Sequence, residues 1–413
     1  MAGTGKTLYL SYDGLTDPLG QSQVLPYIIG LNEKGYNYHI VSFEKPANTD
    51  KIQGIREELN RHKIQWTPLS YTSKPPVLST LYDIYRLRKT VLRIIGDEPS
   101  KYILHCRSYI TSLIGLSMKR KYGSKFIFDM RGFWADERID GNIWSLGNPV
   151  FRLIYRYFKS KEKKFFTSSD YTISLTHAGK SEIYKLLHTE TEEVSPIQVI
   201  PCCVDNDLFD YNKLTPNDVA QTREQLNIAA DTFVLGYVGS IGTWYMLPEM
   251  VTFFKQLLKV RQNAVFLFIS KENPSAIYGE FERQEIDTSH VRITGSARSE
   301  MPRHIAVFDW SIFFIKPVFS KQASSPTKQG EIMSMGKPIV CNSNVGDTEQ
   351  IIKKYDAGIV TESFEASDFE KIAHQMLNYE ISPGKIRQGS IEFYNLGAGI
   401  DSYNEVYTYI RAC

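Results

Sequence analysis

The sequence predicts an α/β protein with two successive domains, each built on a parallel sheet that helices cover on both faces. Three observations predict this fold class. Short apolar runs alternate with stretches of 3.6-residue hydrophobic period along most of the chain, as in doubly wound sheets. The alternation is interrupted after Pro201 by a mixed linker that extends to Asp218, and it then starts again. A length of 413 residues also exceeds one typical core and favours two or three domains.

The elements follow from these runs in order. The first domain, residues 1–203, is expected to contain six strands at residues 7–12, 38–43, 102–105, 126–130, 172–175 and 197–200. A turn-rich loop follows the first strand and leads into a periodic helix at residues 21–34, as in the first βα unit of a doubly wound sheet. The second domain, residues 204–396, is expected to contain a helix at 247–260 and strands at 233–238, 265–269, 290–293, 310–315 and 338–341. Ligand sites belong outside the carboxyl ends of such strands.

Composition describes an ordinary soluble globular chain, with 42% hydrophobic and 23% charged residues. The five cysteines are odd in number and match no metal-binding spacing, which predicts reduced thiols in a cytoplasm. We find no signal-like start and no apolar run long enough to cross a bilayer, so we expect a protein that is not integral to a membrane. Residues 1–200 carry a formal charge of +8 and residues 201–413 one of −6, which suggests an anionic partner for the first half.

The segment 320–349 has the organisation of an anion site. A loop of small residues leads into a short helical stretch at 328–335, which Gly336 ends, and a buried strand follows. Lys328 lies in the first turn of this helix and Glu331 one turn further along. A phosphate ester could bind the exposed amides while the carboxylate holds a sugar hydroxyl. The alternative is an ordinary αβ unit whose loop is merely polar.

Arginines follow two expected strands of the first domain. Arg107 and Arg131 come just after the predicted strand ends, and Asp129 and Asp136 accompany Arg131. Such arginines could hold a diphosphate or an acidic acceptor in a bidentate way, and the carboxylates could take a proton from a sugar hydroxyl. A network that simply ties the loop together is the alternative.

Loops of the second domain supply further candidates. Gly239 and Ser240 end its first strand, where backbone amides could touch a phosphate, and Arg298 follows the strand at 290–293. Tight packing alone would also explain these glycine-containing loops. Asp205 and Asp207 form a DxD pattern that we interpret as a turn, and we predict no metal site.

Residues 151–166 predict a helix in which basic residues are interleaved with aromatics. Such a helix could lie on an anionic bilayer, or it could be a plain surface helix whose aromatics pack on the sheet. We do not expect nucleic acid as a partner, because the net charge is only +2 and no binding module is recognisable.

Several motifs together resemble a known family. They are Val199-Ile-Pro-Cys-Cys-Val-Asp205 with Phe209, the stretch from Ala323 to Glu331, the following Met-Gly-Lys-Pro-Ile-Val, and Gly346-Asp-Thr-Glu349. Their sequence and order are similar to those of family-4 (group 1) glycosyltransferases, which have the two-domain GT-B fold with a cleft between two Rossmann-like domains. The segments Asp13–Gly20 and Arg131–Glu137 resemble a bacterial cell-surface polysaccharide branch of that family.

The resemblance implies roles for individual residues. Glu331 would bind the nucleotide ribose, Thr327 and Lys328 the diphosphate, and Gly239 would line the donor loop, with Ser325, Ser240, Arg298 and Lys316 as further donor-binding candidates. Gly20 and Gln21 would lie on the acceptor side. Arg131, Lys328, Arg107 and Asp136 are the catalytic candidates, and the C-terminal helix, 397–413, would cross back to the first domain.

Three departures from the family pattern affect the transfer mechanism. The first glutamate of the family's E-x7-E pair is Ala323 here. The basic pair after the Gly239 strand is replaced by Ser240 and Trp244, which leaves charge neutralisation to Lys328, Lys316 or Lys321. Histidines common after the fourth and fifth strands are replaced by Arg107 and Arg131.

The resemblance therefore predicts a cytoplasmic, retaining, metal-independent glycosyltransferase of surface polysaccharide biosynthesis, without a cofactor. It would move a sugar from a UDP or GDP type donor to a lipid-linked or glycan acceptor, at the inner face of the membrane if residues 151–166 contact anionic lipid. A nucleotide-sugar epimerase of the same fold and a non-catalytic partner protein are the alternatives.

Overall fold

A computed structural model describes residues 6–187 and 194–412 of the chain. The chain forms two compact units. Unit 1 comprises residues 1–201, 322–324 and 396–413, and unit 2 comprises residues 202–321 and 325–395. The prediction had placed the change of domain at residues 203/204 and 396/397. The cleft predicted between the domains stays a prediction.

Unit 1 is built on a seven-stranded sheet of order β3-β2-β1-β4-β5-β6-β7, and every pairing is parallel. Its strands are β1 (Lys6–Ser11), β2 (Asn37–Glu44), β3 (Gln65–Ser70), β4 (Tyr102–Arg107), β5 (Lys125–Asp129), β6 (Tyr171–Ser174) and β7 (Ile197–Val199). Its helices are α1 (Pro18–Gln23), α2 (Leu25–Glu33), α3 (Ile52–Arg61), α4 (Leu78–Ile95), α5 (Ser108–Tyr122), α6 (Trp134–Asp140), α7 (Pro149–Ser168), α8 (His177–Leu187) and α17 (Leu396–Ala412).

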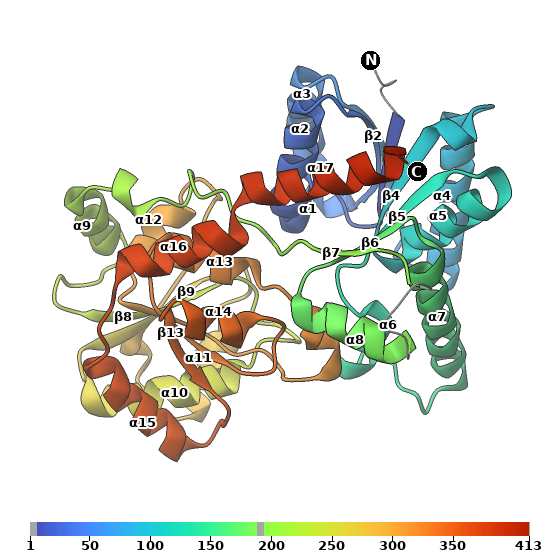
Figure 1. Ribbon diagram of the computed structural model, residues 1–413. Coiled ribbons are helices and arrows are strands. Elements are labelled where there is room, and N and C mark those ends of the chain that lie inside the picture. Colours follow the sequence, from blue (N-terminus) through green and yellow to red (C-terminus); the bar gives the residue numbers. More distant parts are fainter. Residues whose placement is uncertain (1–5, 188–193, 413) are drawn as a thin grey trace. The chain divides into compact units, whose positions relative to one another are not determined.

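The core of unit 1 lies between this sheet and the helices α4, α5 and α7. Alternate residues of the central strands, such as Leu104, Phe126 and Phe128, pack with Phe165 and Phe166 of α7. The intervening residues face the other side of the sheet, where α17 packs beside α2 (Figure 1). Side chains that alternate between two buried faces are what a sheet covered on both sides requires.

Unit 2 carries a six-stranded parallel sheet of order β10-β9-β8-β11-β12-β13. Its strands are β8 (Phe233–Val238), β9 (Ala264–Ile269), β10 (Val291–Thr294), β11 (Trp310–Phe313), β12 (Ile339–Asn342) and β13 (Gly358–Thr361). Its helices are α9 (Pro216–Gln225), α10 (Leu247–Val260), α11 (Ser275–Arg283), α12 (Met301–Ala306), α13 (Thr327–Ser334), α14 (Thr348–Lys354), α15 (Ala366–Leu377) and α16 (Pro383–Tyr394). Within this unit α10 packs on α15, and α13 packs on α16 (Figure 1).

The predicted α/β class with two parallel sheets is confirmed, and eleven of the thirteen strands overlap predicted ones. The two strands that the prediction missed, β3 and β13, both lie at sheet edges. Every residue of β3 is exposed or half-buried, and Pro68 interrupts its apolar pattern. Edge strands tolerate such residues because one side of the strand forms no ladder hydrogen bonds.

The helix predicted over residues 21–34 is instead two helices, α1 and α2, that meet at Val24. Pro26 occupies the first turn of α2, where its missing N–H costs nothing, and this explains why a new helix begins there.

Candidate functional site

Two ionisable side chains of α13 are buried in unit 2. Lys328 is 7% exposed and Glu331 is 8% exposed, and they lie one turn apart on the helix. The helix ends at Ser334, and Gly336, whose φ is +66°, lets the chain turn toward β12. Because Lys and Glu are rarely buried without partners, the groups around them show what the helix can bind.

The ammonium of Lys328 lies among aromatic rings. Its Nζ donates a hydrogen bond to the Tyr237 hydroxyl at 3.0 Å and lies 3.6 Å from the centroid of the Tyr245 ring. The Tyr237 hydroxyl in turn donates to the Ser240 carbonyl. A Cβ on Gly239 would lie 3.2 Å from Nζ, so the loop after β8 passes close to the ammonium. Among the described residues, no carboxylate lies within 4.0 Å of Nζ.

This arrangement predicts proton uptake when an anion binds. Burial lowers the pKa of Lys328 well below its usual value, and Glu331 opposes that shift only in part. A bound diphosphate would favour the ammonium and raise this pKa again. Between the free and bound pKa values, affinity for UDP should therefore fall by up to about tenfold per pH unit as pH rises.

Calorimetric titration of UDP in buffers of different ionisation enthalpy measures this proton uptake directly. The variant Lys328→Met should bind UDP without it. If the parent protein and the variant take up equal numbers of protons when UDP binds, a group other than Lys328 is responsible for the proton uptake.

Glu331 is held by an arginine from a neighbouring loop. Its Oε1 accepts a hydrogen bond from Nη1 of Arg298 at 3.2 Å, and the guanidinium also lies over the Phe209 ring. Burial raises the pKa of Glu331, while Arg298 and Lys328 oppose that shift. Arg298 follows β10, so the structure brings together two residues that the sequence placed on separate motifs.

The other predicted donor-side residues of unit 2 occupy nearby loops. Gly239 has φ +111°, a conformation that favours glycine, and its N–H donates to the Ile269 carbonyl. Thr327 is the first residue of α13, and the Ser325 hydroxyl accepts a hydrogen bond from the Cys202 N–H at 3.1 Å. Lys316 is tied through its backbone, because its N–H donates to the Trp244 carbonyl.

Trp244 stands where the resemblance would place a basic residue. The Nζ of Lys321 lies 3.7 Å from the centroid of the Trp244 ring. A second lysine of unit 2 is therefore also held against an aromatic side chain, as Lys328 is. Aromatic residues in a strand or loop are usually interpreted as core. No sequence signal therefore indicated that Tyr237, Tyr245 and Trp244 surround lysines.

Unit 1 contains a buried polar cluster at the carboxyl ends of β4 and β5. The Asp129 Oδ2 atom lies 3.3 Å from His105 Nε2 and accepts a hydrogen bond from the Tyr403 hydroxyl at 3.3 Å. Its other oxygen lies 3.7 Å from Nη1 of Arg131. Burial would raise the pKa of Asp129, but Arg131, His105 and Arg107 together lower it below its usual value.

Arg107 closes β4 rather than following it, which corrects the predicted strand end at residue 105. Arg131 adopts φ +59° just after β5. The α17 residues Tyr403 and Tyr407 complete the cluster, and the Tyr407 hydroxyl lies 2.7 Å from His105 Nδ1. Their separation in sequence from His105 explains why no motif predicted them.

Asp136 belongs to a different network. Its carboxylate accepts hydrogen bonds from Tyr155 at 2.9 Å and from Lys159 at 2.8 Å, both on α7. Lys159 also pairs with the buried Glu162, whose pKa is raised by burial. The polar contacts of Asp136 connect α6 to α7, as the alternative of a tying network expects, and its catalytic role stays a prediction.

The loop after β1 is fixed by a buried carboxylate that the prediction did not include. Glu44 accepts hydrogen bonds from the Leu15 N–H at 2.9 Å and the Thr16 N–H at 3.0 Å. The predicted acceptor-side residue Gln21 donates to the Thr16 carbonyl at 3.0 Å. Gly20 packs so closely that a Cβ would lie 2.2 Å from the Gly14 carbonyl oxygen.

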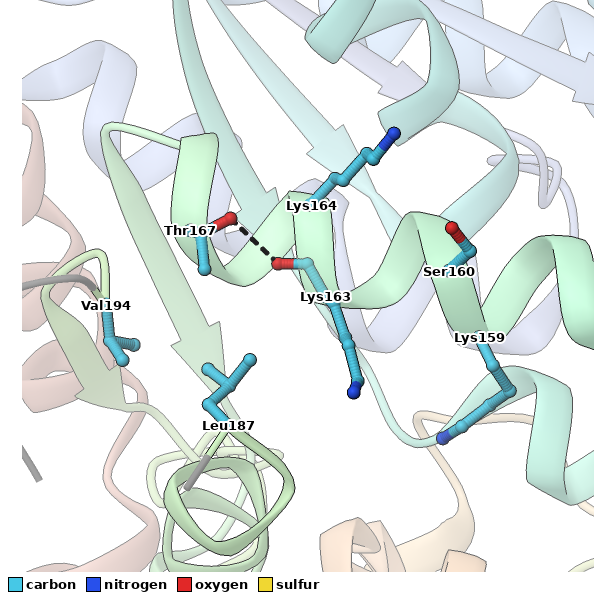
Figure 2. A pocket seen from close by; sticks show the side chains of 7 residues that line it. All are labelled: Lys159, Ser160, Lys163, Lys164, Thr167, Leu187 and Val194. Atoms are coloured by element: carbon cyan, nitrogen blue, oxygen red, sulfur yellow. Dashed lines mark hydrogen bonds between the residues drawn. The ribbon is translucent and has the colours of Figure 1, made fainter. Parts of the chain in front are cut away.

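A basic hollow of about 600 Å³ lies beside α7 in unit 1. It is lined by Lys159, Ser160, Lys163, Lys164, Thr167, Leu187 and Val194. Figure 2 shows Lys163 and Lys164 extending to different sides of the helix. The apolar side chains Phe158, Phe165 and Phe166 are buried, whereas Leu153 is 70% exposed. The predicted packing of aromatics on the sheet is thus present, together with an exposed apolar residue on the same helix.

The structure also bears on the DxD pattern, the cysteines, metal-binding groups and membrane-spanning helices. Asp205 and Asp207 form the predicted turn, because Asp205 Oδ1 accepts from the backbone N–H groups of Asp207 and Leu208. The four described cysteines are unbridged and buried. The described residues contain no group of three or more His, Cys, Asp or Glu arranged to hold a metal ion. Across residues 6–187 and 194–412, no helix is both long and apolar enough to cross a membrane.

Comparisons with known proteins identify a family signature in unit 2. Residues 232–379 match the family model described as Glycosyl transferases group 1. One curated relative is TuaH of Bacillus subtilis (strain 168), named as a teichuronic acid biosynthesis glycosyltransferase, which is 26% identical over 233 residues. That match covers 55% of this chain and 53% of the relative, so the chain spans about half the length of the relative it matches.

Solved structures resemble the chain over nearly its full length. A glycosyltransferase from Rickettsia africae ESF-5 has a TM-score of 0.70 at 15% identity, with 98% of each chain covered. Anabaena HepE in complex with UDP-glucose has a TM-score of 0.71 at 13% identity, with 97% of this chain and 99% of HepE covered. At such identities the likeness shows the fold, and the predicted GT-B fold class is confirmed.

Proposed function

Because residues 232–379 match the family model described as Glycosyl transferases group 1, we propose that this chain transfers a sugar from a nucleoside diphosphate to an acceptor in surface polysaccharide biosynthesis. The observation that carries the proposal is the pair Lys328 and Glu331, buried one turn apart on α13. Among the described residues, no carboxylate lies within 4.0 Å of the Lys328 ammonium, so this cation can bind a diphosphate. The Glu331 carboxylate one turn away can accept hydrogen bonds from a ribose.

Each donor group has a counterpart in unit 2. The ribose hydroxyls donate to Glu331, whose orientation Arg298 fixes. The diphosphate lies against Lys328 and the Gly239 loop, where a Cβ on Gly239 would lie only 3.2 Å from the ammonium nitrogen. We favour a UDP type donor over GDP, since HepE, which shares the fold, binds UDP-glucose.

The same groups support the reaction. Negative charge grows on the leaving diphosphate as its bond to the sugar breaks and a bond to the acceptor oxygen forms. Lys328 is positioned to neutralise that charge, and a donor of this kind is typically worth about 3 kcal/mol. The charge neutralisation comes from side chains, so the proposed reaction needs neither metal nor cofactor, and it retains the anomeric configuration, as the family resemblance implies.

The position of the family's first glutamate is closed in this chain. Ala323 is fully buried, and its Cβ lies 2.9 Å from where a Cβ on Gly179 would be. A glutamate there would displace the start of α8. We therefore assign recognition of the donor to Glu331 and Lys328 rather than to a pair of glutamates.

Thermal-shift measurements with UDP, GDP, ADP and their glucose conjugates test the function. UDP and UDP-glucose should stabilise the parent protein and the surface control Glu282→Ala, but not Glu331→Ala. Stabilisation by none of the nucleotides would contradict the proposal. Release of a free, epimerised sugar nucleotide without any acceptor would instead support the epimerase alternative.

We further propose a lipid-linked acceptor that is reached at the cytoplasmic face of an anionic membrane through α7. Val150, Leu153 and Tyr157 are exposed on this helix, and Arg152 and Arg156 are interleaved with them. Apolar side chains beside arginines suit the boundary between lipid headgroups and acyl chains. Each basic residue near such a surface contributes about 1 kcal/mol.

Sedimentation with vesicles tests this contact. The protein should sediment with phosphatidylglycerol-containing vesicles and not with pure phosphatidylcholine, and high salt should release it. The double variant Arg152→Gln, Leu153→Ser should lose most of this binding, while Tyr278→Ser, an exposed aromatic of unit 2, should keep it. Equal sedimentation of the double variant and the parent protein would rule out α7 as the contact.

A further inference from the structure

Arg107 is a buried cation whose hydrogen-bonding capacity is only partly used. Its side chain is 4% exposed, at the carboxyl end of β4. Neither Nε nor Nη1 has a hydrogen-bond partner among the described residues. A guanidinium carries five N–H donors, and leaving buried donors unpaired is costly. Beside the hydrogen bond that Arg107 shares with Tyr9, these two N–H groups are therefore available to an acceptor from outside the chain.

Arg107 belongs to a buried cluster of charged side chains around Asp129. Arg107 and Arg131 both lie close enough to the buried Asp129 carboxylate to lower its pKa. One Asp129 oxygen is already shared by His105 and Tyr403. Asp129 therefore already serves several groups, and the Nε and Nη1 donors of Arg107 stay available to a further anion.

The Asp13 carboxylate lies between solvent and Arg107, on the side from which such an anion would approach. Its Oδ2 atom lies 3.7 Å from Nε of Arg107, too far for a hydrogen bond, and its side chain is 55% exposed. Asp13 belongs to the loop that Glu44 fixes through Leu15 and Thr16. The exposed Asp13 carboxylate can turn away without disturbing that loop, which opens a route from solvent to the guanidinium.

We propose that unit 1 binds an oxyanion of the acceptor on Arg107 and Arg131, either the carboxylate of an acidic sugar or a phosphate ester. The anion site stands on the geometry of unit 1, and its assignment to the acceptor rests on the proposed function. Arginine suits both oxyanions because its planar fork donates two parallel hydrogen bonds to carboxylate or phosphate. The bound oxyanion takes the place of the Asp13 carboxylate beside Arg107.

Titrations of sodium glucuronate and of inorganic phosphate, followed by thermal shift at matched ionic strength, test this site. Glucose and sodium chloride serve as controls for the sugar ring and for salt. At least one of the two anions should stabilise the parent protein, and the more effective one identifies the source of the oxyanion. Arg107→Gln should weaken its binding about tenfold or more. The surface variant Arg120→Gln on α5 should bind it as the parent does.

Asp13→Asn supplies a test with the opposite sign. It removes the carboxylate that competes for Arg107 and should tighten anion binding, a result that a purely structural role for Arg107 does not produce. No stabilisation of the parent protein by either anion, or equal stabilisation of Arg107→Gln, would overturn the proposal. The UDP shift that depends on Glu331 is measured in the same samples, so failure of the anion site and failure of the proposed function are distinguishable.

Discussion

Lys328→Met should lower kcat/KM for sugar transfer by about a hundredfold or more, with most of the loss in kcat. The reason is that the ammonium neutralises charge that develops on the departing diphosphate, and removing one such donor typically costs about 3 kcal/mol. Initial rates of UDP release from UDP-glucose, measured with a membrane extract as the source of acceptor, give this value.

Stability separates this effect from misfolding. Methionine fills a volume similar to that of the lysine stem, and the Tyr237 hydroxyl keeps its hydrogen bond to the Ser240 carbonyl. Removal of a buried amine should therefore leave the melting temperature unchanged or raise it. The control Lys371→Met removes an exposed ion-paired lysine and should keep full activity. If Lys328→Met keeps the kcat of the parent protein, Lys328 does not stabilise the leaving diphosphate and the proposed role is wrong.

Glu331→Ala should weaken UDP binding about tenfold to a hundredfold, because hydrogen bonds to a charged group contribute about 1.5–3 kcal/mol each. The same change should leave the binding of inorganic pyrophosphate nearly intact, since the carboxylate contacts the ribose and not the phosphates. Isothermal titration with both ligands measures the two affinities.

Glu331→Gln serves as the conservative comparison. It keeps the side-chain volume and one acceptor oxygen, so its affinity for UDP should fall between those of the parent protein and Glu331→Ala. If pyrophosphate binding falls as much as UDP binding in Glu331→Ala, the ribose assignment is wrong and the carboxylate supports the helix instead.

The central strands were predictable because they are buried on both faces and their apolar runs are continuous. The helix α10 coincides with its predicted range, and α13 differs from its prediction by one residue at each end. The edge strands β3 and β13 were missed, since half-buried residues do not produce the same signal.

The candidate site was predictable where a motif is local. Lys328 and Glu331 lie on one short helix, so their spacing alone placed them on adjacent turns. The aromatic residues around Lys328 come from β8 and the loop that follows it. The sequence of a buried strand does not show which side chain its tyrosine will contact in the folded protein. Asp136 was proposed for catalysis from its place after β5, and that role stays a prediction. Its partners Tyr155 and Lys159 were not predictable, because they come from α7, which contacts Asp136 only in the folded chain.

A crystal structure of the protein grown with UDP tests the central claim most directly. The account predicts a phosphate oxygen within about 3 Å of Lys328 Nζ, beside Gly239, with ribose hydroxyls at hydrogen-bond distance from Glu331. A nucleotide bound elsewhere in unit 2, with Lys328 still enclosed by Tyr237 and Tyr245 and without a phosphate contact, would contradict it.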